Sequence, residues 1–272
     1  MVRKLLFTLG FGLLSVGSES HSPVAAQEAA QVERATSAKA RGALLWDYDQ
    51  AAWHGTDRFQ VDFKDGYPQG TRGYIVEPAD SGGYDSIFYA ERDGRLVAVA
   101  RYRWSSGSTV TGGPVTSDNS ALSTKLEQMI RARQIALDSA SDIKDLVYCS
   151  KSLPNTIVLP PEADGTVSVY LLSPTNDATV YPLGGHSRID VSAAGKVVAS
   201  RPFMKSCFPV TWKEENGQKP EAFFATHVLD AQPNEIDFFV SRNIPIVMMI
   251  GAGGWIWPIA GGELYEARQM KR

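Results

Sequence analysis

The sequence predicts an α+β protein built mostly from antiparallel strands, with one long helix at about residues 120–139 and a short helix near the amino end. Three observations predict this class. Short runs of β-branched and aromatic residues recur along the chain, as in strands. Turn sequences such as Asp93-Gly94 and Ala194-Gly195 separate neighbouring runs, as in hairpins. Apolar residues three and four positions apart mark the two helices.

The amino end has the pattern of a secretory signal peptide over residues 1–26. Arg3 and Lys4 precede an apolar run of 13 residues, Leu5–Gly17, and Val24-Ala25-Ala26 supplies the small residues favoured before cleavage. An uncleaved anchor is the alternative, but the run is shorter than the ~20 residues that span a bilayer. We therefore expect a periplasmic or secreted protein with no transmembrane span in the mature chain.

Two segments follow the predicted leader. Residues 27–41 are rich in alanine and polar residues and are interpreted as a tether or a frayed helix. From Gly42, apolar residues at helical spacing predict a short helix ending near His54-Gly55. Strand patterns follow it at Gly73–Glu77, Ser86–Glu91 and Arg95–Arg103. Residues 42–104 are thus predicted to form a small module of one helix and a β-meander.

The remainder is predicted to be a linker and a larger α+β domain. Residues 105–119 have the Ser, Thr, Gly and Pro content of a linker, and the domain spans residues 120–272. Its long helix begins after a cap supplied by Ser117, Asp118 or Ser120. Its predicted strands are Thr156–Leu159, Thr166–Leu172, Ser187–Val191, Lys196–Ser200, Phe223–Thr226, Ile244–Ile250 and Trp255–Ile259.

Charge and motifs exclude several function classes. The formal net charge is −3, whereas nucleic acids and anionic membrane surfaces select dense positive charge, so neither is expected as a partner. No Gly-x-Gly-x-x-Gly segment follows a strand, and no phosphate-binding Gly-x-x-x-x-Gly-Lys motif occurs. We expect no cofactor, and an unknown protein or small molecule as the partner.

The chain has two cysteines, Cys149 and Cys207, which are 58 residues apart. In an oxidising compartment an even number of cysteines predicts a disulfide. Metal binding is the weaker alternative, because no second cysteine lies close to either one.

Two stretches, Gly184–Asp190 and Thr226–Asp237, concentrate the side chains capable of chemistry. Both lie at predicted strand ends or in loops, where binding groups are usually placed. We expect them to line one common cleft with His227 at its centre. The predicted binding residues are His186, Arg188, Asp190, His227 and Asp230.

The order of elements in the C-terminal half resembles that of JAB/MPN (JAMM) metallopeptidase-like domains. A long helix, strands, His227 at a strand end and a Pro-Asn-Glu-Ile-Asp segment carry the resemblance. It implies that His227 matches the second histidine of the family's His-x-His pair and Asp237 its aspartate. Ala225 occupies the position of the first histidine, so the full metal motif is absent.

Two functions follow from these patterns. The first is an exported, non-catalytic binding or interaction module of the periplasm or cell envelope. The alternative is a zinc-dependent hydrolase. In it, His227, His186 and one of Asp230 or Asp237 would hold the ion, and Glu235 would be the general base.

Overall fold

The computed structural model describes residues 23–270, so residues 1–22 of the predicted signal peptide lie outside the described residues. Within that range the chain is α+β, as predicted. Its helices are α1 (Pro23–Asp62), α2 (Thr124–Ser139) and α3 (Glu235–Ser241), and short 3₁₀ turns occupy Ser117–Asn119 and Ala140–Asp142. No helix within residues 23–270 has the length and apolar character needed to cross a bilayer.

The amino-terminal helix is much longer than the sequence predicts. α1 has 40 residues and includes the 27–41 segment, so the interpretation of that segment as a tether is wrong. Ala35 and Ala38 are buried there, and Arg34 donates a hydrogen bond to Gln232 over 3.0 Å. The apolar contacts of this segment are small alanine methyl groups, which is why the pattern of large apolar residues failed to reveal them.

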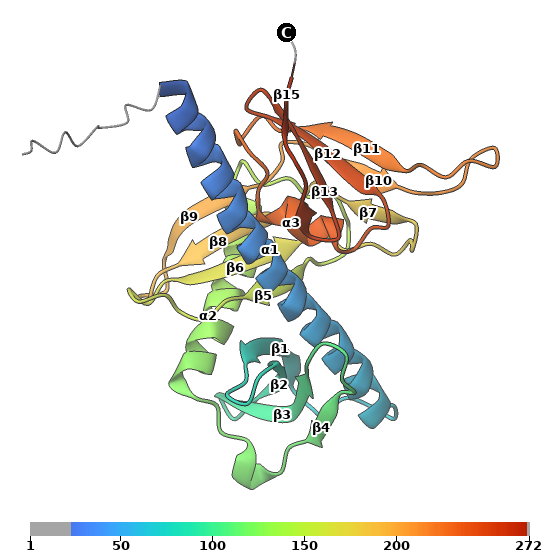
Figure 1. The fold of residues 1–272 in the computed structure, drawn as a ribbon. Helices are drawn as coiled ribbons and strands as arrows, with labels where there is room; N and C mark the ends of the chain where they lie inside the picture. Colours follow the sequence, from blue (N-terminus) through green and yellow to red (C-terminus); the bar gives the residue numbers. More distant parts are fainter. Residues whose placement is uncertain (1–22, 271–272) are drawn as a thin grey trace, which may run out of the picture.

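Two glycines let α1 approach its neighbours closely. A Cβ atom at Gly42 would lie 2.6 Å from the Glu235 carbonyl oxygen, and one at Gly55 would lie 2.7 Å from Ser86 Cβ. Gly42 therefore marks the crossing with α3, and Gly55 the contact with β2. Figure 1 shows α1 running past both regions, with the β1–β4 sheet beside its carboxyl-terminal half.

The first sheet is an antiparallel meander in the order β1 (Thr71–Pro78), β2 (Tyr84–Arg92), β3 (Arg95–Trp104) and β4 (Thr111–Pro114). The Asp93-Gly94 turn joins β2 and β3, and both residues have positive φ, 50° and 72°, as type I′ hairpins require. β4 lies inside the predicted 105–119 linker and pairs with β3, so that segment is partly sheet.

The second sheet has the order β5 (Asn155–Val158), β6 (Val167–Leu172), β8 (Ser187–Val191) and β9 (Val197–Pro202), all antiparallel. α2 ends where predicted but begins at Thr124, four residues later than predicted, because its cap is Ser123 and not Ser117, Asp118 or Ser120: the Ser123 side chain accepts a hydrogen bond from the Leu126 amide. Its buried face, which includes Met129 and Ala136, packs on this sheet.

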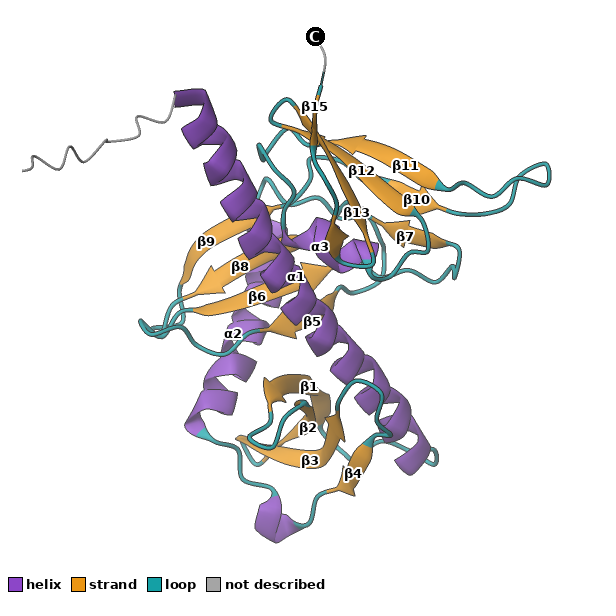
Figure 2. Cartoon of the chain, in the orientation of Figure 1, coloured by secondary structure: helices purple, strands orange, loops and turns teal. Residues whose placement is uncertain are grey.

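The last two sheets complete the carboxyl-terminal part. β7 (Val180–Pro182) pairs with β10 (Pro209–Thr211), and Figure 2 shows the loop after β10 projecting from the body. β11 (Ala222–Thr226) lies parallel to β12 (Val247–Ala252), because the chain between them passes through α3. The antiparallel strands β13 (Trp255–Ala260), β14 (Glu263–Leu264) and β15 (Arg268–Gln269) extend that sheet.

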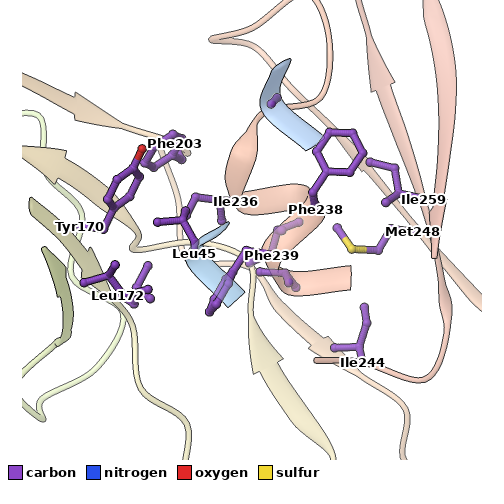
Figure 3. Packing of buried hydrophobic residues seen from close by; sticks show 14 of the residues in the cluster. Leu45, Tyr170, Leu172, Phe203, Ile236, Phe238, Phe239, Ile244, Met248 and Ile259 are labelled. Atoms are coloured by element: carbon purple, nitrogen blue, oxygen red, sulfur yellow. The ribbon is translucent and has the colours of Figure 1, made fainter. Parts of the chain in front are cut away.

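The largest core cluster joins both predicted modules. Leu45 of α1 and Phe239 of α3 lie in it together with Val76, Trp104 and Tyr170. Figure 3 shows Leu45 between the side of Tyr170 and Leu172 and the side of α3. Residues 42–104 therefore share their packing with the remainder of the chain.

The predicted disulfide is confirmed. Cys149 and Cys207 are bonded, with their Cα atoms 5.3 Å apart. The bridge closes a loop that contains β5 to β9.

Candidate functional site

The two stretches that the sequence singles out do meet in space. Arg188 Nη1 of β8 lies 3.6 Å from Glu235 Oε1 at the start of α3. Arg201 Nη2 of β9 lies 3.0 Å and 3.1 Å from the two oxygens of Asp230. We call this group the α3 network: Tyr170, Arg188, Asp190, Arg201, His227, Asp230, Glu235 and Asp237.

The acidic groups of the α3 network have partners inside the protein. Tyr170 donates to Glu235 Oε1 over 3.2 Å, and Ser168 donates to Asp190 Oδ1 over 2.8 Å. The Asn234 side-chain nitrogen, Nδ2, donates to Asp230 Oδ2 over 3.2 Å. Glu235, the predicted general base, is thus held between a tyrosine hydroxyl and arginines, which favours a structural role over proton transfer.

His227 and Asp237 form the innermost pair of the network. The distance from His227 Nε2 to Asp237 Oδ2 is 2.8 Å, and the side chains are 2% and 1% exposed. Burial lowers the pKa of His227, but the charge and hydrogen bond of Asp237 more than offset this, so the pKa is raised above 6.5. An open cleft with His227 at its centre is therefore not what the structure shows.

Asp237 also caps α3. Its carboxylate accepts a hydrogen bond from the Asn234 backbone N–H over 2.8 Å, and the Asn234 side chain accepts one from the Ile236 N–H. This is a capping box, in which the side chains satisfy amide donors at the helix start. The Pro-Asn-Glu-Ile-Asp segment was expected to lie in a loop, and its capping residues instead begin a helix.

His186, predicted to bind a ligand, is 1% exposed and fully bonded to backbone. Its Nδ1 accepts from the Ser173 N–H over 3.2 Å, and its Nε2 lies 2.8 Å from the Pro182 carbonyl oxygen, to which it donates. Burial lowers the pKa of His186 to about 4, so it is neutral at pH 7. Its role is to hold the end of β6 against the end of β7.

These residues do not fit a zinc ion. Both ring nitrogens of His186 are used, and His227 Nε2 is bonded to Asp237. Within residues 23–270 no three or more His, Cys, Asp or Glu side chains are grouped to hold a metal. A catalytic zinc site needs three protein ligands, and these side chains do not supply them.

A different region offers an open cleft of about 620 Å³, between α1, β1 and the loops around β7. We call it the Asp49 cleft. Its volume lies within the ~300–1,000 Å³ typical of small-molecule sites. It is lined by Asp49, Gln50, Ala52, Trp53, Thr56, Tyr74, Asn155, Ser173, Pro174, Thr175, Ala178, Tyr181 and Asn243.

Besides the Trp53 indole, six polar side chains of the Asp49 cleft form no hydrogen bond or ion pair with any residue of the described chain. Other polar groups of the lining are satisfied internally: Thr56 donates to the Ala52 carbonyl over 2.7 Å, and Asn243 donates to the Phe239 carbonyl over 3.0 Å. Among the described residues, the buried side-chain atoms without a partner belong to Tyr48, Arg188 and Arg242, so the unbonded atoms of the cleft are accessible to solvent and free to bond a ligand. The six are Asp49, Gln50, Tyr74, Asn155, Ser173 and Tyr181.

Asp49 is the charged group of this lining, and its environment perturbs it. Burial raises its pKa from 3.8 to about 6. Tyr74 and Tyr181 have raised pKa values, first because they are buried and second because Asp49 is near; that of Tyr74 is about 12. A perturbed carboxyl group in a cleft is a frequent property of functional sites.

A larger depression of about 1150 Å³ lies beside the projecting loop after β10. Its lining includes Lys213, whose ammonium group is paired with Asp177 at 2.7 Å, and Lys219 and Glu221, which are exposed. It lacks the enclosed, partnerless polar groups of the Asp49 cleft, so we favour the latter as the site.

Sequence reasoning missed the Asp49 cleft because its walls come from distant segments. Tyr74, Ser173 and Tyr181 belong to separate strands and loops, and nothing local connects them. One signal was present. Asp49 lies four residues after Leu45 and three before Ala52, so a carboxylate interrupts an apolar helical face.

Comparison with known proteins found no match to a family model, a curated protein or a solved structure. The resemblance to JAB/MPN domains therefore stays a prediction.

Proposed function

We propose that the chain is an exported, non-catalytic binding protein of the periplasm or cell envelope that takes a small ligand in the Asp49 cleft. The observation that carries the proposal is the set of six partnerless polar side chains around one cleft of ligand size. The disulfide between Cys149 and Cys207 supports the exported part, since such bonds persist in oxidising compartments.

Binding is favoured over catalysis by the surroundings of Ser173. Its hydroxyl lines the cleft, but within residues 23–270 no imidazole or carboxylate is bonded to it. The nearby His186 ring instead accepts a hydrogen bond from the Ser173 backbone N–H and donates one to the Pro182 carbonyl oxygen. A serine nucleophile needs a base within hydrogen-bond reach, so this pair lacks the activating contact.

The binding proposal is tested by thermal melting of the purified protein against a library of small molecules of mixed charge. Ligands that bind the folded state raise the melting temperature by mass action. Ala178→Trp places a large ring at an exposed position of the lining and should abolish these shifts. Ala121→Trp, at an exposed position outside the lining, is the matched control and should preserve them.

A library without a single stabilising compound, or shifts that survive Ala178→Trp, would contradict the proposal. Export is tested separately by cell fractionation and amino-terminal sequencing of the recovered protein. We expect an envelope or secreted fraction that begins at Gln27. A cytosolic protein that begins at Met1 would refute export without bearing on the cleft.

A further inference from the structure

We infer that the Asp49 cleft selects a small organic cation, whose ammonium group bonds the Asp49 carboxylate while its apolar body lies against the aromatic rings of the walls. This inference rests on the proposed function and adds the charge and chemical class of the ligand. It follows from the charge of the lining, its aromatic content and its unused hydrogen-bond acceptors.

The charge of the lining is one-sided. Asp49 is a carboxylate, and the described lining contains no Lys, Arg or His. Tyr74 from β1 and Tyr181 from β7 are the titratable groups on which Asp49 acts, and the Arg133 guanidinium of α2 acts on Tyr74 from outside the lining. An anionic ligand would lie beside Asp49 without a compensating cation, which is unfavourable in a partly buried site. A cationic ligand would supply the positive charge that pairs with the Asp49 carboxylate.

Aromatic rings border the carboxylate. Trp53 is 56% exposed and stacks on His54, with ring centroids 4.8 Å apart and an interplanar angle of 21°. This stacking covers one face of the indole. Tyr74 and Tyr181 line other walls of the cleft. Aromatic faces attract ammonium groups and pack against apolar carbon, which suits an amine with an aromatic or aliphatic body.

The remaining partnerless groups suit the donors of an ammonium group. A primary ammonium has three N–H donors, and the Asp49 carboxylate can accept one or two of them. Ser173, Tyr181 and the Gln50 carbonyl can accept another. A metal cation fits the lining less well, because Ca²⁺ takes six to eight oxygen ligands and the lining contains one carboxylate.

Three probes of similar size and different charge test the inference: phenethylammonium, 2-phenylethanol and 3-phenylpropionate. Binding is followed by tryptophan fluorescence and by titration calorimetry. We expect phenethylammonium to bind roughly tenfold or more tightly than the alcohol, and the propionate most weakly. Asp49→Asn should remove the preference for the ammonium probe. Asp57→Asn, at an exposed position of the same helix, should retain it.

The pH dependence gives a second readout. Asp49 is charged above about pH 6 and neutral below it, so phenethylammonium should bind more weakly as the pH falls from 8 to 5. The affinity for 2-phenylethanol should change little, because that probe carries no charge.

The outcomes separate this inference from the proposed function. Equal binding of all three probes, or tightest binding of the propionate, overturns the cationic ligand and leaves a small-molecule cleft. A preference for the ammonium probe that persists in Asp49→Asn also overturns it. If no probe binds at millimolar concentration and the compound library yields no ligand, both the inference and the proposed function fail.

Discussion

The α3 network and the Asp49 cleft each bring together ionisable side chains from distant segments. The two regions differ in whether these side chains are bonded to other groups of the protein. In the network, carboxylates meet arginine, histidine, hydroxyl or amide partners, and the innermost pair is almost fully enclosed. In the cleft, a carboxylate and two tyrosines stand beside an open volume with no bond to the described protein. The difference teaches that a dense cluster of chemical side chains can serve mainly to hold the fold, even though one of its atoms, Arg188 Nε, is buried without a hydrogen-bond partner in the described chain. Unbonded polar groups indicate a candidate site only where they also border an open volume.

The largest expected effect is on the network. Asp237→Ala removes the acceptor of both His227 and the Asn234 N–H, leaving polar groups buried without partners. Breaking a buried charged pair in this way should lower the free energy of unfolding by about 3–5 kcal/mol. Urea denaturation measures it. A loss below about 1 kcal/mol would show that the pair is not structural and would remove the contrast between the two regions.

Substitution of Asp49 in the cleft should have the opposite effect and raise the free energy of unfolding at neutral to basic pH. The folded pKa of Asp49 is raised from 3.8 to about 6, so its stability contribution is fully present below about pH 3.8 and is lost as pH rises through about 6. The pKa values of Asp49 in the unfolded and folded states differ by roughly two, which corresponds to about 3 kcal/mol of stability. Asp49→Asn should therefore be more stable than the wild type at pH 8.

The advantage of Asp49→Asn should shrink as the pH is lowered to 5, because the wild-type carboxyl group then becomes protonated. Urea denaturation of both proteins across this range checks the trend. Asp57→Asn provides the baseline for replacing an exposed carboxylate on the same helix. A wild type that is more stable than Asp49→Asn at pH 8 would mean that Asp49 has a stabilising partner, and the cleft would then resemble the network.

The smallest effect is expected at the exposed edge of the network. Arg201 pairs with Asp230, but its side chain is 36% exposed and solvent screens the interaction. Arg201→Ala should lower the free energy of unfolding by about 1 kcal/mol or less. Binding of phenethylammonium should remain unchanged, since Arg201 does not line the Asp49 cleft. A loss of binding would show that Arg201 affects the Asp49 cleft and that the two regions are not independent.

Much of the fold could be predicted from the sequence because its signals are local. The meander at 71–104 has the Asp93-Gly94 turn between its strands, and helix α2 has regular apolar periodicity, although its cap is Ser123 and not one of the three residues predicted. α1 was underestimated because alanine carries little periodic signal. The seven-residue α3 was missed because its acidic start looked like a loop of functional groups, whereas Asp237 is the reciprocal partner in a helix cap.

The candidate site could not be predicted to the same degree. The prediction that the stretches containing Arg188 and Glu235 lie close together was correct, because both residues lie near the ends of elements that the topology brings together. Proximity did not reveal that the groups satisfy each other. The Asp49 cleft brings together segments up to 194 residues apart, as Asp49 and Asn243 are, and no spacing rule reports such neighbours.

The close crossing at Gly42 has a consequence for the order of folding. α1 belongs to the first quarter of the chain, but its partner α3 spans residues 235–241. Contacts of such sequence separation form late and slow the search for the native state. During vectorial synthesis, the residues of α1 that contact α3 therefore lack their partner until nearly the whole chain has emerged.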